Sequence, residues 1–315
     1  MQQHQRKNEI KGALILLLAA IIWGLAFVAQ VSGSSLPPLS FNAIRFTIGA
    51  IILLPVAIIT TKKQHLHDTK RAIKASAICG FVLFIAMTCQ QYGCILSRNA
   101  GESGFLASLS IIFVPLIGIF LGKRLRLPII IAVVLSVLGL YLLVFIGGTG
   151  TWDMGDALLL VAAFAMAIQS IVIARVAGSV DPMQLSFGQI VMVALLSWIG
   201  APFLGGLPTV AGIHYAVGQL LYTGILSTGV AYTLQIIGQK TVDPAPATII
   251  MCLQSLFSVI AGAILLHEMM NWNGYIGCLL MLIGSFVAEI PSRTEKSNKL
   301  LPRILNSNYS HRKKN

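Results

Sequence analysis

The sequence has few charged side chains, few cysteines and none of the short motifs that mark common enzymes. Charged residues make up 10% of the 315-residue chain. No GxSxG, HExxH or Walker sequence appears, so nucleophilic, zinc-dependent and ATP-driven chemistry all lack their residues. The five cysteines form no CxxC pair, which argues against a disulfide framework or a metal site. We therefore expect no enzyme activity, no cofactor and no bound metal.

Acidic side chains are also missing from the middle of the apolar segments. Glu102, Asp156 and Glu268 are expected at segment ends on one side, and Glu289 at a segment end on the other. A proton antiporter of the small multidrug type needs an intramembrane carboxylate for which substrate and proton compete. The absence of such a carboxylate disfavours proton antiport, and we expect transport by facilitated diffusion or exchange instead.

Apolar residues dominate what remains. They make up 56% of the chain, and the mean hydropathy is +0.84. This composition predicts an all-α membrane protein, in which each spanning helix needs about 20 apolar residues. The sequence predicts ten transmembrane helices, at 12–32, 39–60, 74–96, 101–121, 127–147, 156–175, 184–204, 214–238, 245–266 and 272–290.

The net charge of +12 is placed in a way that argues against nucleic-acid binding. If the N-terminus is cytoplasmic, 20 of the 22 Lys and Arg residues fall on the cytoplasmic side, and only Arg98 lies in an outer loop. This bias predicts a multi-pass protein of the bacterial cytoplasmic membrane with both termini inside. The basic tail, residues 291–315, is expected to act as a topology signal or to contact anionic lipids.

The ten segments form two sets of five that match each other. Because five is odd, the second set must cross the bilayer upside down relative to the first. We therefore expect two inverted five-helix repeats, at 12–147 and 153–290, with a substrate site near the midplane where they meet. A shift of 144 positions superposes Pro38 on Pro182, Gly80 on Gly224, Gln91 on Gln235, Phe113 on Phe257 and Gly118 on Gly262.

Several short motifs, in order, resemble the EamA-type family of the drug/metabolite transporter superfamily. They are Trp23-Gly24-Leu25-Ala26-Phe27, Arg45-Phe46, Leu265-Leu266-His267-Glu268 and Gly284-Ser285-Phe286. The resemblance covers nearly the whole membrane part and implies a ten-helix fold and small-molecule transport. In one departure from the pattern, the first half has Lys123-Arg124 where the second half carries His267-Glu268.

Arg45 is the most distinctive candidate for substrate binding. It lies about two turns into the second segment, where burying a cation costs at least about 2.5–3.5 kcal/mol. One interpretation is a bidentate contact with an anionic substrate group. The alternatives are that it snorkels to the outer interface or pairs with Glu102. Its equivalent in the second repeat is the neutral Gln189.

Polar and aromatic residues near the middle of other segments complete the predicted site. Gln91 and Gln235 occupy equivalent positions and suit two gates that open in turn, although interhelical hydrogen bonding explains them equally well. The same two interpretations, a gate or an interhelical hydrogen bond, apply to Tyr232. Trp23 suits a cavity wall or plain helix packing. Two further polar residues suit ligand contact or close helix approach, namely Ser108 and Gln254.

The favoured interpretation is a secondary transporter that exports small polar or amphipathic metabolites, such as amino acids, by alternating access of the two repeats. A multidrug or dye efflux carrier is the nearest alternative. A membrane-embedded enzyme acting on lipid-linked substrates and a non-transporting assembly subunit are two more. The expected partners are a small-molecule substrate and membrane lipids, and both a monomer and a homodimer remain open.

Overall fold

The computed structural model is a helical bundle, as the composition predicts. It describes residues 2–61, 66–97, 99–120, 122, 127–143, 153–176, 180–239, 241–242 and 244–288, and every element in these ranges is a helix. The predicted fold class is therefore confirmed, and the chain is an all-α membrane protein. The predicted basic tail lies outside the described residues.

The first five apolar segments follow one another in the order expected. The fourth is divided at Leu109 rather than forming one helix as predicted. The helices are α1 (Gln2–Ser32), α2 (Pro38–Thr61), α3 (Leu66–Ser97), α4 (Ala100–Ser108) with α5 (Ser110–Phe120), and α6 (Leu127–Tyr141).

The second five segments repeat this order with two differences from the prediction. The segment predicted at 184–204 ends at Gly200, because the chain turns at Gly205 and Gly206, whose φ angles are 109° and 95°. The following segment contains ten residues of π-helix. The helices are α7 (Met154–Val176), α8 (Pro182–Gly200), α9 (Val210–Leu221) with η2 (Tyr222–Ala231) and α10 (Tyr232–Gln239), α11 (Pro244–Leu265), and α12 (Trp272–Ala288).

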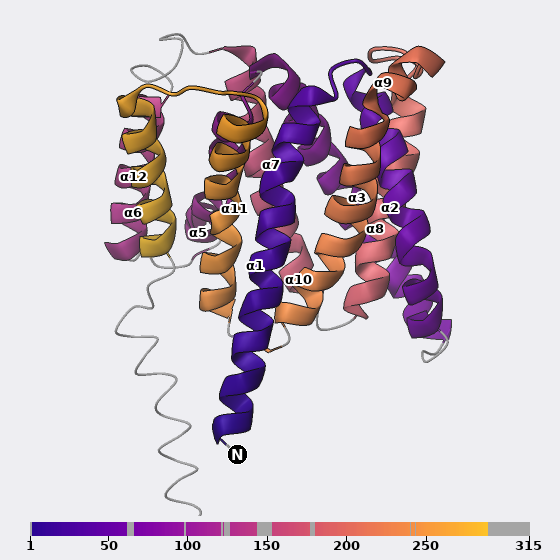
Figure 1. Cartoon of the computed structure of the whole chain (residues 1–315). Helices are drawn as coiled ribbons and strands as arrows, with labels where there is room; N and C mark the ends of the chain where they lie inside the picture. The colour runs from indigo at the N-terminus through magenta and orange to yellow at the C-terminus, as the bar shows by residue number, and fades with distance from the viewer. Residues whose placement is uncertain are drawn as a thin grey trace, which may run out of the picture.

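Six helical stretches in the described part of the chain are long and apolar enough to cross a bilayer by length and composition. Three shorter apolar helices accompany them, at Leu127–Tyr141, Ile250–Leu265 and Trp272–Val287. The remaining segment is the continuous run of α9, η2 and α10. The bundle that results has α6 and α12 paired at one flank and α2 and α8 at the other, with α1 between them (Figure 1).

Two glycine contacts show that the repeats seen in the sequence are also repeats in space. A Cβ added to Gly80 of α3 would lie 2.5 Å from Met192 Cβ of α8. A Cβ added to Gly224 of η2 would lie 2.7 Å from Ile48 Cβ of α2. Gly224 follows Gly80 by 144 positions, and Met192 follows Ile48 by the same number. The same close helix crossing is therefore built twice from equivalent residues.

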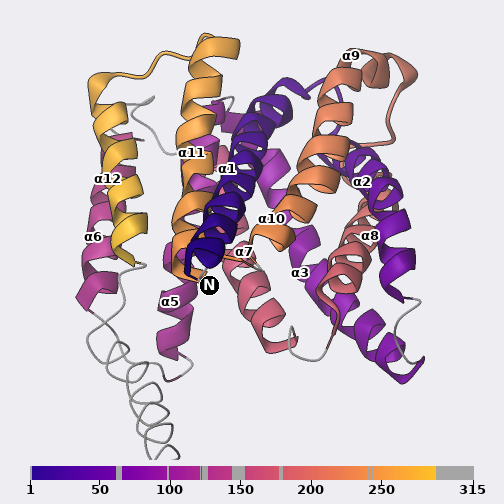
Figure 2. The same ribbon diagram turned by 60° about the horizontal axis from the view of Figure 1, so that its bottom comes forward.

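The second repeat runs in the opposite direction to the first. We call the face of the bundle where α1 begins the N face and the opposite one the far face; the N face is at the bottom of Figure 1 and comes forward in Figure 2. The start of α7 lies at the far face beside the end of α3, where a Cβ on Gly155 would lie 2.7 Å from the backbone nitrogen of Ser97. Thus α1 starts at one face and its counterpart α7 at the other.

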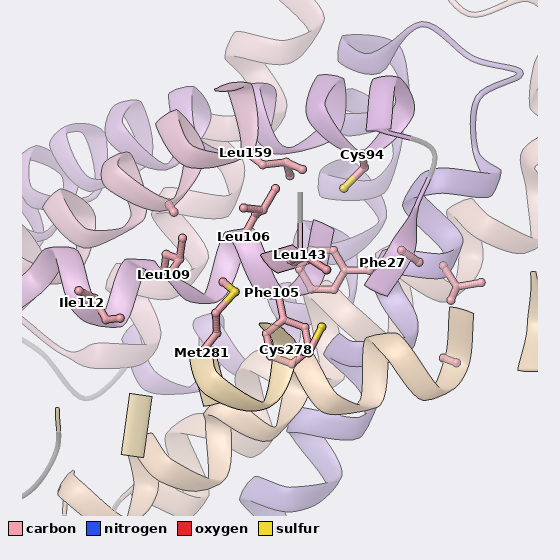
Figure 3. Close-up of a cluster of buried hydrophobic side chains, with 14 residues drawn as sticks. Phe27, Cys94, Phe105, Leu106, Leu109, Ile112, Leu143, Leu159, Cys278 and Met281 are labelled. Carbon is pink, nitrogen blue, oxygen red and sulfur yellow. The ribbon is translucent and has the colours of Figure 1, made fainter. Parts of the chain in front are cut away.

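The largest hydrophobic cluster joins the two halves. Phe27 of α1, Leu106 of α4, Leu159 of α7 and Met281 of α12 are all buried within it, at no more than 4% exposure (Figure 3). Side chains from both repeats thus share this cluster.

Candidate substrate-binding site

Arg45 is fully enclosed in the far half of the bundle. Its side chain is 3% exposed, and Nη2 donates to Met87 Sδ of α3 at 3.5 Å. The guanidinium carbon lies 4.8 Å from the ring centroid of Phe46 and 5.8 Å from that of Phe41. Neither alternative raised by the sequence describes this position, because the side chain does not reach the interface and contacts sulfur and aromatic rings rather than Glu102.

Several polar atoms around Arg45 are buried without a hydrogen-bond partner in the described part of the chain. They include Nε of Arg45, Oδ1 of Asn42 and Oε1 of Gln91. The amide of Asn42 donates to the backbone oxygen of Met87 at 3.0 Å, so α2 and α3 meet at this point. Unpaired buried polar atoms are rare and costly, and in this setting they indicate a place for a polar ligand or water.

Gln91 belongs to a network of amides between α1 and α3. It is fully buried, and Nε2 donates to the backbone oxygen of Gln30 at 3.1 Å. The neighbouring Gln90 donates to Oε1 of the same Gln30 at 3.0 Å. Gln91 therefore forms an interhelical hydrogen bond, which was one of the two interpretations of this residue. Its Oε1 has no hydrogen-bond partner among the described residues and can accept from another donor.

Trp23 connects α1 with the π-helical segment and with α10, the helix that follows it. Trp23 Nε1 donates to the backbone oxygen of Ser227 in η2 at 2.9 Å, and the Trp23 ring meets Tyr232 edge to face at 5.1 Å. The π-helix was not predicted from the sequence, since its residues are as apolar as those of an ordinary helix. Such segments occur often at functional sites.

Tyr232 lies between the aromatic and the cationic parts of this region. Besides meeting Trp23, it is close enough to Arg45 to interact electrostatically with the guanidinium. Trp23, Arg45, Gln91 and Tyr232 thus form one neighbourhood contributed by α1, α2, α3 and α10. Four of the seven predicted residues are brought together there, and Asn42 and Gln30 are members that the sequence reasoning missed.

The other three predicted residues lie apart. The Ser108 hydroxyl donates to the backbone oxygen of Gly104 in its own helix at 2.8 Å. Gln235 and Gln254 are partly exposed, and neither side chain is hydrogen-bonded to another described residue. The equivalence of Gln91 and Gln235 in the sequence is therefore not matched by equivalent contacts in space.

Comparison with known proteins supports the architecture. A profile of the EamA-like transporter family matches residues 10–145 and 153–289. The chain belongs to the EamA-like transporter family. Relatives include an uncharacterized transporter of Archaeoglobus fulgidus, 27% identical over 87% of this chain and 84% of its own length. The uncharacterized transporter YoaV of Bacillus subtilis is 25% identical, over 88% of this chain and 96% of its own.

A solved crystal structure supports the fold independently. It has a TM-score of 0.64 and 21% identity, over 89% of this chain and 98% of the solved one. The family profile and the related transporters confirm the resemblance seen in the short motifs, and this EamA-like protein is a transporter.

Glu268, one of the motif residues, caps a helix of the other repeat in this EamA-like transporter. Its Oε1 accepts from the backbone N–H of Ala100 at 2.7 Å, and its Oε2 accepts from that of Gly101 at 3.2 Å. Both donors belong to the first turn of α4, where N–H groups have no partner within the helix. Burial raises the pKa of the Glu268 carboxyl, and these two hydrogen bonds partly offset the rise. The side chain therefore ties the loop after α11 to α4 at the far face.

The fourth and ninth segments end in a similar backbone conformation. His267 and Gly122 both have left-handed backbone angles, with φ of 56° and 82°, where α11 and α5 end. In both cases the left-handed residue lies two positions beyond the last residue of the helix.

We expect Glu268→Ala to destabilise the folded transporter by about 1–2 kcal/mol, because two N–H groups of α4 lose their acceptor. Glu268→Gln keeps one acceptor oxygen and should cost less than Glu268→Ala. Thermal unfolding in detergent measures both, and Met269→Ala, at a neighbouring exposed side chain, is the control. Equal midpoints for Glu268→Ala and Met269→Ala would show that the cap contributes nothing.

Proposed function

We propose that this transporter carries small metabolites that bear a carboxylate, such as amino acids, and exports them by alternating access of its two repeats. The observation that supports this most directly is the enclosed guanidinium of Arg45. No Asp or Glu in the described part of the chain lies close enough to balance its charge. A buried cation without a counter-ion is costly, and a substrate carboxylate would supply the missing charge.

The neighbouring groups suit the rest of such a substrate. Asn42 Oδ1 and Gln91 Oε1 are acceptors that a substrate ammonium or hydroxyl group could reach, and Trp23 with Tyr232 offers an apolar wall. Substrates of this kind are small enough to pass between two repeats that rock around a central site.

A ligand screen tests the proposal. Purified protein is heated with amino acids, each paired with its amide and its methyl ester, and with sugars, nucleosides and cationic dyes. The free carboxylates should raise the unfolding temperature, and their amides and esters should not. Stabilisation by dyes alone would favour the multidrug alternative and overturn the carboxylate proposal. Hits are then assayed for flux in proteoliposomes.

The proposed orientation makes the N face cytoplasmic, on the strength of the basic residues counted in the sequence. In a variant without native cysteines, an impermeant thiol reagent added outside should label a cysteine at position 149 and leave one at position 63 unlabelled. The reverse pattern would invert the topology and make the far face cytoplasmic.

The proposed energetics need no central carboxylate. Glu102 and Asp156 lie in the first turns of α4 and α7, close enough to interact electrostatically, at the far face rather than at mid-depth. We expect Glu102→Gln and Asp156→Asn each to retain transport driven by a substrate gradient, with an unchanged response to an imposed pH gradient. Complete loss of pH-driven flux in either variant would show that this pair couples transport to protons.

A further inference from the structure

A cavity of about 530 Å³ lies well away from Arg45, at the N face. It opens between α2 and α3 and has α8 as its floor. None of the seven predicted site residues lines it. Its lining includes Leu54 and Ile58 of α2, Ile73 and Ala77 of α3, and Gly188 of α8. The volume is within the range of about 300–1,000 Å³ typical of small-molecule sites, so the cavity is large enough to hold a ligand.

The character of the lining favours a hydrocarbon ligand. Only two lining residues have polar side chains, Ser76 and Gln184, and the others are apolar or glycine. Leu54 and Ile73 are 43% and 65% exposed, so the cavity opens sideways on the surface that faces lipid. A polar metabolite would find few hydrogen bonds there, whereas an acyl chain needs none.

The length of the cavity along α8 matches the thickness of one leaflet of a bilayer. Its floor on α8 runs from Gln184 to Leu195, a rise of about 16 Å at 1.5 Å per residue. Half of a hydrocarbon core about 30 Å thick is about 15 Å. The cavity therefore extends from the boundary of the membrane to near its middle, as an acyl chain does.

Exposed cations stand in the first turns of α3. Lys70 and Lys74 lie at helical spacing from the lining residues Ile73 and Ala77, and Arg71 is exposed beside them. The first turns of α3 therefore present ammonium groups above apolar lining residues. This order of charge and hydrocarbon complements an anionic phospholipid, whose phosphate lies above its chains.

At the equivalent place on the far face, two of the lining residues have bulkier counterparts. Trp198 stands where the first repeat has Leu54, and its Nε1 donates to Thr47 Oγ1 at 3.0 Å. The lining residue Gly188 corresponds to the larger Ile44 at the far face. The lining residue Phe187 corresponds to the smaller Ala43.

The charges differ between the two places as well. Lys70 and Lys74 correspond to His214 and Gly218, so the far face lacks the lysine pair. Of the two equivalent places, the one that holds the cavity therefore also holds the lysine pair, and the other does not carry the lysines.

We propose that this cavity binds one acyl chain of an anionic phospholipid from the leaflet at the N face, with the phosphate held by Lys70 and Lys74. The lipid would occupy the crevice between α2 and α3, two helices that contact each other little along their length. Its binding site is separate from that of the transported substrate, so the two proposals stand or fall independently.

Lipid titration followed by native mass spectrometry tests the site. The probes are phosphatidylglycerol and phosphatidylcholine with identical chains, added to the delipidated full-length protein. We expect phosphatidylglycerol to bind more tightly, and Lys70→Gln and Lys74→Gln each to weaken it about five-fold. Lys11→Gln removes an exposed cation at the same face, away from the cavity, and should leave binding unchanged.

Variants that fill the cavity test the contact with the acyl chain separately from the contact between the phosphate and the lysines. Leu54→Trp copies the residue at the equivalent far-face position and should weaken the binding of both lipids, while Trp198→Phe should weaken the binding of neither. If Leu54→Trp fails to fold, Ala77→Leu, which copies Leu221, tests the same point. Unchanged phosphatidylglycerol binding in the filled variant, or equal effects of Lys11→Gln and Lys74→Gln, would overturn the proposal.

Discussion

Arg45→Gln is expected to weaken binding of a carboxylate substrate by about tenfold or more. A hydrogen bond to a charged group contributes about 1.5–3 kcal/mol, and glutamine has no charge with which to replace it. Arg45→Lys keeps the charge but loses the planar pair of donors, so its affinity should fall between those of the wild type and Arg45→Gln. Equilibrium binding of a hit from the ligand screen measures all three.

The same substitution should leave the substrate-free protein at least as stable as the wild type. A buried cation with no counter-ion is a cost that glutamine removes. Weaker binding combined with unchanged or higher stability distinguishes a substrate contact from a structural one. Arg175→Gln, at an exposed position of α7, controls for loss of a positive charge and should change neither quantity. Unchanged affinity in a well-folded Arg45→Gln protein would remove Arg45 from the site.

Gly80→Ala and Gly224→Ala are expected to destabilise the fold to a similar extent. The added methyl groups would lie 2.5 Å and 2.7 Å from Met192 and Ile48, so two helix crossings must open. Overpacking of this kind typically costs about 1–3 kcal/mol. Because the two crossings are equivalent, the two losses should be alike. Unfolding in mixed detergent micelles measures each free energy.

Gly218→Ala is the matched control for both variants. Gly218 lies in α9, in the same spanning segment as Gly224, and a Cβ there would meet no atom within 4 Å. This substitution should be neutral, or should stabilise the helix by up to about 1 kcal/mol. A neutral Gly224→Ala together with a damaging Gly80→Ala would show that the two crossings are not equivalent in energy.

The number of apolar segments and their order in two repeats follow from the sequence alone. Each segment has the length and composition that a bilayer requires, and no folding information is needed to see it. The repeat is readable because glycine, proline and glutamine recur at one spacing, and the structure shows what Gly80 and Gly224 have in common: both allow two helices to touch. The orientation in the membrane stays a prediction, since it depends on charges that act through the bilayer.

The site could be predicted only in part. Arg45, Gln91, Trp23 and Tyr232 attracted notice because polar and aromatic residues are conspicuous in apolar segments. Asn42 and Gln30 were equally polar, but the sequence did not show that they face the same region. Gln235, Gln254 and Ser108 met the same criterion and lie elsewhere.

Only the tertiary structure determines the rotation of each helix about its axis, and therefore which side chains point into the bundle. A helix that is apolar all round has no polar stripe to show its rotation, so the direction of Arg45 depends on packing against Met87 and Phe46. The same holds for the π-helix whose Ser227 accepts a hydrogen bond from Trp23, for the cap that Glu268 places on α4, and for the cavity between α2 and α3 at the N face. Chain composition determines that these helices enter the membrane, and side-chain fit between neighbours determines how they meet there.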